Sequence, residues 1–252
     1  MKLDLRHTAG SVALLAAMLG LWWLASHLGW MNRAFLPTPE AAFGALGDGF
    51  TGGSLGSDTL ATVGRMLLGW GLASLCGVVL GALIGSSEAA RRWLQPTLEF
   101  MRPLPASALM PLAIALFGLS AGMVLAVVAF GAMWPVLLAT VHGFGALHGR
   151  LREVGRALQL SRRAFVAQVG LPHAMPDILA GMRLSMTISL IVSVVGEMLA
   201  SQPGLGQAIL LAARSYQASE LFAGVMLLGG IGFASNAALA AAEAHLLRWQ
   251  RR

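Results

Sequence analysis

Apolar runs, each about as long as a membrane helix, are the feature that most limits what this chain can fold into. A helix needs roughly 20 mostly apolar residues to cross a bilayer. The runs that approach this length lie at residues 10–30, 65–84, 101–116, 123–141, 178–199 and 221–242. Only 11% of the residues are charged, against about a quarter in a typical soluble domain. The sequence therefore predicts an all-α membrane protein in which residues 1–252 form one domain of about six transmembrane helices.

The positive charges are distributed unevenly between the segments that flank these runs. Most of the 17 lysines and arginines lie before the first run, in residues 86–96, in residues 142–177 or after the last run. Cytoplasmic loops carry an excess of lysine and arginine, so we expect both termini and the 142–177 loop in the cytoplasm. We therefore interpret the net charge of +6 as a sign of how the chain is oriented in the membrane. We expect no nucleic-acid partner, because aromatic side chains are not interleaved with the basic ones.

Local features refine this picture. Small residues recur every four positions in the second run, at Ala73, Gly77, Gly81 and Gly85, and predict a groove that lets another helix approach closely. Pro135 should kink the fourth run or free a backbone carbonyl. A short interfacial helix is expected near residues 39–46. The first run is interpreted as an uncleaved span, because no small-x-small cleavage site follows it.

The 142–177 loop has the composition of short helices rather than of a span. We expect two of them, broken near Ser161, whose side chain can cap the second. A Leu171-Pro172 element follows. The next helix should then start with Pro176 in its first turn and Asp177 at its positive end. Such a rigid group could dock into a groove on a soluble partner, and a solvated basic loop is an equal alternative on the residues alone.

The same loop resembles the EAA loop of permeases in binding-protein-dependent ABC importers. Glu153 matches the Glu of that motif, Val154 and Gly155 stand at its two alanines, and Leu171-Pro172 match its Leu-Pro. Gln159 replaces its Gly, which leaves the sharpness of the break between the short helices open. Further segments similar to this family, above all to its nitrate, sulfonate and taurine branch, are Leu36–Pro39, Arg102–Gly118, Glu197–Leu199 and Gly204–Gly206.

The resemblance implies a type I importer permease in the cytoplasmic (inner) membrane of a bacterium. Its implied partners are a cytoplasmic ABC ATPase dimer, an extracytoplasmic substrate-binding protein and a second permease copy, which we expect to be identical. The implied solute is a small anion such as a sulfonate, taurine or nitrate, with a pyrimidine precursor or bicarbonate as alternatives. The residues implied to couple to the ATPase are Glu153, Gly155, Arg156, Ala157, Leu158, Gln159, Ser161, Leu171 and Pro172.

The distribution of lysine bears on nucleotide chemistry. A phosphate-binding loop needs a Lys after its Gly-rich turn, and the only Lys in this chain is Lys2. We therefore expect no catalytic residue and no cofactor here, with ATP and Mg²⁺ bound by the partner ATPase. The histidines show no ligand spacing, so no metal site is expected either.

Ionisable and flexible side chains within the spans are candidates for the translocation pathway. Glu197, near the outer end of the fifth run, could line the pathway or a gate, or it could form a structural hydrogen bond to a neighbouring helix end. Arg183 could extend to the interface or contact an anion. Met186 and Met198 are further pathway candidates that equally suit irregular packing.

Two other classes of membrane protein compete with the permease. An intramembrane protease would need His-Glu-x-x-His, Gly-x-Ser-Gly or paired aspartates within the spans, and the sequence has none of these. A self-sufficient channel or secondary transporter usually places ionisable groups or broken helices near the middle of the membrane. Apart from Pro135, the predicted spans are poor in both.

Overall fold

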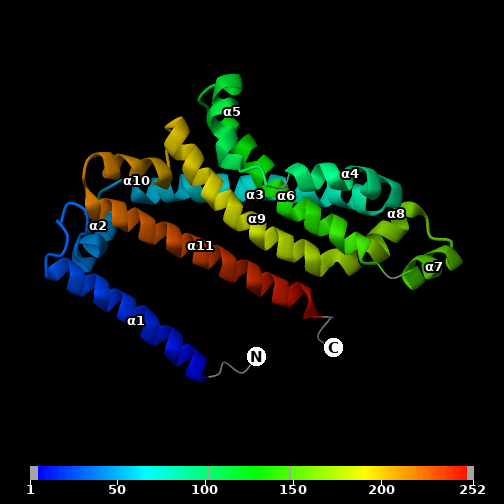
Figure 1. Ribbon diagram of the computed structural model, residues 1–252, viewed down its shortest axis with the longest axis horizontal. Coiled ribbons are helices and arrows are strands. Elements are labelled where there is room, and N and C mark those ends of the chain that lie inside the picture. The colour runs from blue at the N-terminus through cyan, green and yellow to red at the C-terminus, as the bar shows by residue number, and fades with distance from the viewer. Residues whose placement is uncertain (1–4, 102, 148, 249–252) are drawn as a thin grey trace.

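The computed structural model describes residues 5–248 except 102 and 148, and its described elements are all helical (Figure 1). The α-helices are α1 (Leu5–His27), α2 (Pro39–Thr51), α3 (Leu55–Gly85), α4 (Glu88–Met101), α5 (Met110–Phe117), α6 (Ala121–Gly145), α7 (Gly149–Ala157), α8 (Arg162–Phe165), α9 (Leu171–Ala200), α10 (Leu205–Arg214) and α11 (Ala218–Leu246). A 3₁₀ turn, η1 (Ala106–Leu109), precedes α5, and a π-helical turn, η2 (Val166–Gly170), joins α8 to α9. The all-α prediction is confirmed.

Within the described residues, four helical stretches are long and apolar enough to cross a membrane. They are α3, α6, α11 and the continuous run from Arg163 to Ala200 that contains α9, and they match the second, fourth, sixth and fifth predicted runs. The apolar part of α1, Ala13–His27, is a shorter helix. The described residues thus hold four span candidates, or five if the bent pair of α4 and α5 counts as one span.

The third predicted run differs most from expectation. In place of one helix over residues 101–116, α4 and α5 form a pair bent by more than 40°, and α5 projects away from the other helices (Figure 1). Pro103 and Pro105 lie between them. Proline lacks the N–H that a helix needs and disfavours helical backbone in the residue before it, so the chain changes direction there.

α4 covers a segment that we expected to be a polar connection. Its polar face is held by pairs one helical turn apart: Arg92 donates to Glu88 at 2.8 Å, and Gln95 donates to Glu99 at 2.9 Å. Such pairs stabilise helices with little apolar surface to bury.

The core is built from α3, α6 and α9, and the predicted groove on α3 is occupied by α6. Small residues at every fourth position of α3 lie against side chains at every fourth position of α6: a Cβ added at Gly77 would meet Val136 Cβ at 2.8 Å, and one added at Gly81 would meet Thr140 Cβ at 2.5 Å. The two helices run in the same direction in this close contact, which confirms the expected packing role of the stripe.

The helix α9 runs antiparallel to α6 and closes the other side of the core. A Cβ added at Gly196 would meet Val124 at 2.4 Å, near the start of α6. Ser185 of α9 donates to the carbonyl of Ala132 at 2.7 Å, three residues before Pro135. These contacts leave the α6 backbone enclosed by two helices, and enclosure of this kind allows a membrane helix to tolerate proline.

Peripheral helices attach to this core at one end. Two indoles near the end of α1 hold the start of α2: Trp22 donates to the carbonyl of Pro37 at 3.0 Å, and Trp23 donates to Glu40 at 2.9 Å. Thr38 caps α2 by accepting from the N–H of Ala41, so the expected short helix near residues 39–46 is confirmed. In Figure 1, α2 and α10 lie together at one end of the molecule and α7 lies at the other.

Candidate coupling module and buried carboxylate cluster

The helices α7 and α8 form a compact unit, here called the coupling module (residues 149–165), that ends α7 in a tight reversal. Gln159 adopts a left-handed backbone, with φ of 50°. The N–H of Gln159 donates to the carbonyl of Arg156, and the N–H of Leu160 donates to that of Gly155, both at 3.0 Å. This pair of bonds is the Schellman arrangement that ends helices at a left-handed residue. The break is therefore sharp even though Gln stands where the family motif has Gly.

Ser161 starts the second short helix, as predicted. Its side-chain oxygen accepts from the N–H of Ala164 at 3.3 Å, and its carbonyl accepts from the N–H of Phe165 at 2.8 Å. A capped start directly after a capped end fixes the angle between α7 and α8 with only local bonds.

A close aromatic contact holds the two short helices together. A Cβ added at Gly155 would lie 2.6 Å from Cδ2 and 2.8 Å from Cε2 of Phe165. Only glycine leaves room for the ring at this distance. This explains why Gly155 occupies an alanine position of the motif, and Phe165 is a member of the module that sequence reasoning missed.

The outer surface of the module combines charge with apolar side chains. Gly155 is buried, whereas Glu153, Arg156 and Ala157 are exposed. Val154 is 53% exposed and Leu158 is 65% exposed. A mixed surface of this kind on a rigid support suits a protein partner.

The start of α9 corrects the sequence prediction. We expected the helix to begin near Pro176, ahead of the apolar run 178–199, but α9 begins at Leu171 and Pro172 occupies the first turn. The N–H of Leu171 donates five residues back, to Val166, which carries the helical run through η2 without a break. Proline is tolerated in a first turn, where N–H groups have no intrahelical acceptor. Pro176 lies inside the helix.

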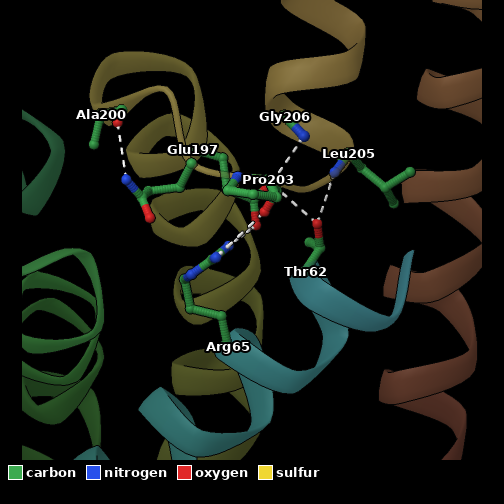
Figure 2. Close-up of polar contacts among 8 residues, drawn as sticks. Thr62, Arg65, Glu197, Ala200, Pro203, Leu205 and Gly206 are labelled. Atoms are coloured by element: carbon green, nitrogen blue, oxygen red, sulfur yellow. Dashed lines mark hydrogen bonds and ion pairs between the residues drawn. The ribbon is translucent and has the colours of Figure 1, made fainter. Parts of the chain in front are cut away.

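Near the other end of α9, Glu197 is the centre of a buried polar cluster (Figure 2). Its side chain is 0% exposed and forms an ion pair with Arg65 of α3. Thr62 donates to Oε2 at 3.0 Å, and the N–H of Gly206 donates to the same oxygen at 2.8 Å. Thr62 in turn accepts from the N–H of Leu205 at 2.9 Å. Both carboxylate oxygens are therefore bonded, as a buried charge requires.

Two glycines let the chain wrap closely around this carboxylate. A Cβ added at Gly204 would lie 2.4 Å from Cδ of Glu197, and one added at Gly206 would lie 2.3 Å from the carbonyl oxygen of Val194. Gly204 also has φ of 151°, which favours glycine. These contacts fit the interpretation in which Glu197 forms structural hydrogen bonds to a neighbouring helix end. A role in the pathway stays a prediction.

The other pathway candidates lie apart from Glu197. Arg183, toward the coupling-module end of α9, forms an ion pair with Glu243 of α11. Met186 is buried, with 5% of its surface exposed, and Met198 is partly buried. The structure brings Glu197 together with Thr62 and Arg65, partners that the sequence did not single out. The Gly204-Leu205-Gly206 spacing was the available signal of a close backbone approach.

These features define a class of protein: a helical membrane subunit with close-packed spans that presents a rigid module on the segment between two of them. The chain belongs to the family of binding-protein-dependent transport system inner membrane components, whose model matches residues 75–252. It is thus an ABC importer permease of the sulfonate, taurine and nitrate branch, located in the inner membrane. Such importers combine the permease with an ATPase and a binding protein.

Similar proteins carry specific names. The putative aliphatic sulfonates transport permease protein of Bacillus subtilis (strain 168) is 30% identical over 235 residues, which cover 93% of this chain and 85% of that protein. The taurine transport system permease protein of Escherichia coli (strain K12) is 27% identical over 249 residues, covering 97% and 90%. The nitrate import permease protein of a Synechocystis species is 30% identical over 185 residues, covering 73% and 67%. Family membership excludes the protease and channel alternatives.

Proposed function

We propose that this chain forms the translocation pathway for a small oxyanion of the sulfonate, taurine or nitrate kind, and that a separate ATPase drives it through the coupling module. The observation that carries the coupling role is the sharp, doubly capped reversal between α7 and α8, which holds the exposed Glu153 on a fixed support. In this proposal ATP and Mg²⁺ bind to the ATPase.

Continuity with α9 supports the mechanical part of the proposal. The coupling module passes into α9 through η2, so Arg163–Ala200 is one helical run. An ATPase subunit that grips the module can then move a helix of the core directly, without a flexible linker that would absorb the displacement. Two identical permease chains would receive two ATPase subunits, and an external binding protein would deliver the solute to the opposite face.

The substrate class rests on the relatives. The printed names of three of them refer to aliphatic sulfonates, taurine and nitrate. A sulfonate group and a nitrate ion share a compact, negatively charged set of oxygens that accepts several hydrogen bonds. We propose this common group as the feature that the importer selects. Bicarbonate and neutral pyrimidines serve as the competing solutes in the test.

The test uses the full complex of this chain, its ATPase and its binding protein in proteoliposomes. ATP hydrolysis and uptake are measured with taurine, alkanesulfonates, nitrate, bicarbonate and a neutral pyrimidine. We expect stimulation by a sulfonate, taurine or nitrate. Stimulation by bicarbonate alone or by the pyrimidine alone would discard the substrate class, and failure of the chains to assemble would count against the coupling role.

A charge reversal tests the coupling module itself. Glu153→Arg should abolish substrate-stimulated ATP hydrolysis and uptake while the permease stays folded, because it places a repulsive charge on the docking surface. Glu88→Arg makes the same change on α4, where it breaks only the exposed pair with Arg92, and it should leave stimulation near the wild-type level because such exposed pairs contribute little. Unchanged uptake in Glu153→Arg would contradict the proposed docking surface.

A further inference from the structure

Phe144, near the end of α6, is the point at which three segments of the core meet. Its side chain is 1% exposed. It forms a buried cluster with Leu147, Ala174 and Ile178. No residue in this cluster is charged, so the cluster acts through shape alone.

Two glycines fit against opposite parts of the Phe144 side chain. At the end of α3, a Cβ added at Gly85 would lie 2.7 Å from Cβ of Phe144. In η2, a Cβ added at Gly170 would lie 2.4 Å from Cε1 and 3.2 Å from Cζ of the ring. The base of the side chain therefore sits against α3, and the edge of the ring sits against the π-helical turn.

The same cluster reaches the coupling module. Phe165, whose ring covers Gly155 of α7, packs against the cluster together with Val166 and Val169 of η2. A continuous series of close contacts thus runs from α7 through Phe165 and η2 to Phe144, and from Phe144 to α3. Close-packed side chains transmit displacement because the interior has little free volume to absorb it.

A π-helical turn is also a suitable place for movement. Such turns are rare and occur often at functional sites. Here the turn lies directly before Pro172, whose ring nitrogen cannot donate a backbone hydrogen bond. η2 is therefore a point where the helix can bend while it stays continuous, so displacement of the module still reaches α9 and the ring of Phe144.

We propose that Phe144 is a positioning residue for coupling: its ring, held between Gly85 and Gly170, transfers displacement of the coupling module to α3 as well as to α9. The inference rests on the proposed coupling role of α7 and α8 and adds the route into the core. A movement of η2 presses on the ring, and the ring carries the end of α3 with it.

The test uses the assembled complex with its ATPase and a fluorophore on Cys76, the single cysteine of the chain, which is exposed on α3. ATP with vanadate is the probe, so no solute is needed. The wild-type complex should show a clear fluorescence change. Gly170→Ala should reduce that change several-fold while ATP hydrolysis persists, because the new methyl group displaces the ring. Phe144→Leu alone should reduce the change as well, because it removes the ring that carries the displacement.

Gly122→Ala, at the opposite end of α6 from Phe144, is the matched control, because a Cβ there has nothing within 4 Å, and it should behave as the wild type. A proportional loss of assembly, ATP hydrolysis and fluorescence change in Gly170→Ala would show a purely structural role and overturn the inference. A wild-type complex that hydrolyses ATP with no change at Cys76 would also overturn it, but would leave the proposed function standing. Failure of the wild-type chains to assemble would instead remove the proposed function.

Discussion

The two ends of α9 are tied to their neighbours in different ways. Near its end, Glu197 is 0% exposed and its partner Arg65 is 11% exposed, and the surrounding backbone closes over the pair. Nearer its start, the ion pair of Arg183 and Glu243 has side chains that are 45% and 29% exposed. Beyond that pair, α9 continues into η2 and the coupling module.

Under the proposed coupling, this difference separates a fixed end of α9 from the end that the ATPase would move. A buried, fully bonded carboxylate is costly to disturb, so the Glu197 cluster fixes α9 against α3 and α10. Toward its start, α9 is held by a partly exposed ion pair near the middle of the helix and, beyond it, by aromatic rings packed on glycines. A helix anchored at one end and driven at the other can act as a lever.

The largest expected effect comes from removing the buried carboxylate of Glu197. Glu197→Ala leaves Arg65, Thr62 and the N–H of Gly206 without their acceptor, and it should lower the free energy of unfolding by about 3–5 kcal/mol. The comparison is Glu243→Ala, which breaks the exposed pair and should cost no more than about 1 kcal/mol. Both are measured by denaturant unfolding in the same detergent. Equal losses in the two variants would remove the distinction between the ends.

A paired replacement separates the cost of a bare charge from the cost of lost packing. Arg65→Leu with Glu197→Leu removes both charges together, and the double variant should recover a large part of the stability lost in Glu197→Ala. Buried ion pairs can often be exchanged for apolar groups at little net cost. If the double variant is no more stable than the single one, packing rather than charge accounts for the loss.

The sequence predicted the helices far better than the contacts at either end of α9. Apolar runs and the four-residue spacing of small side chains located α3, α6, α9 and α11, because helix length and side-chain periodicity are local properties. The partner of Glu197 could not be found in this way, because Thr62 lies 135 residues away in the chain and a hydroxyl in a span usually bonds to its own helix.

At the start of α9, the sequence located the elements but did not predict their backbone geometry. The motif located the module, and Ser161 was recognised as a cap, but Gln159 left the reversal open because non-glycine residues seldom take a left-handed backbone. The start of α9 was placed several residues too late because both Pro172 and Pro176 suit a first turn, and the sequence alone does not show that η2 makes the helix continuous. These errors concern backbone choices that tertiary packing decides.

A smaller effect is expected at Gln159, where the stability of the reversal between α7 and α8 can be measured. Gln159→Gly relieves the cost of a side chain in the left-handed region and should stabilise the reversal by about 1 kcal/mol. Ala157→Gly introduces the same residue two positions earlier, at the last residue of α7, and should destabilise the helix end by up to about 0.5 kcal/mol. Hydrogen exchange of the amides in residues 149–165 should slow in the first variant and speed up in the second. A change in the same direction in both would contradict the geometry of the reversal.

The smallest effect is expected at the contact between α1 and α2, which lies apart from both ends of α9. The backbone N–H of Glu40 bonds to its own carboxylate and holds the pKa of that group below its ordinary value, with further bonds from Thr38 and Trp23. Because the pKa is lowered in the folded state, the carboxylate stabilises the fold above the ordinary glutamate pKa of about 4.3 and loses this contribution as the pH falls through the lowered value.

The difference in melting temperature between the wild type and Glu40→Gln should accordingly be present at about pH 7 and disappear at an acid pH below the lowered pKa. Trp23→Phe removes the indole that donates to Glu40 at 2.9 Å, so the gap between Trp23→Phe and its Glu40→Gln double variant should be smaller at neutral pH. A gap that is the same at both pH values would mean that the charge on Glu40 does not contribute. The contact between Trp23 and Glu40 is exposed and lies apart from α9. Disturbing it should therefore leave the Glu197 cluster and the proposed response of the coupling module to the ATPase unchanged.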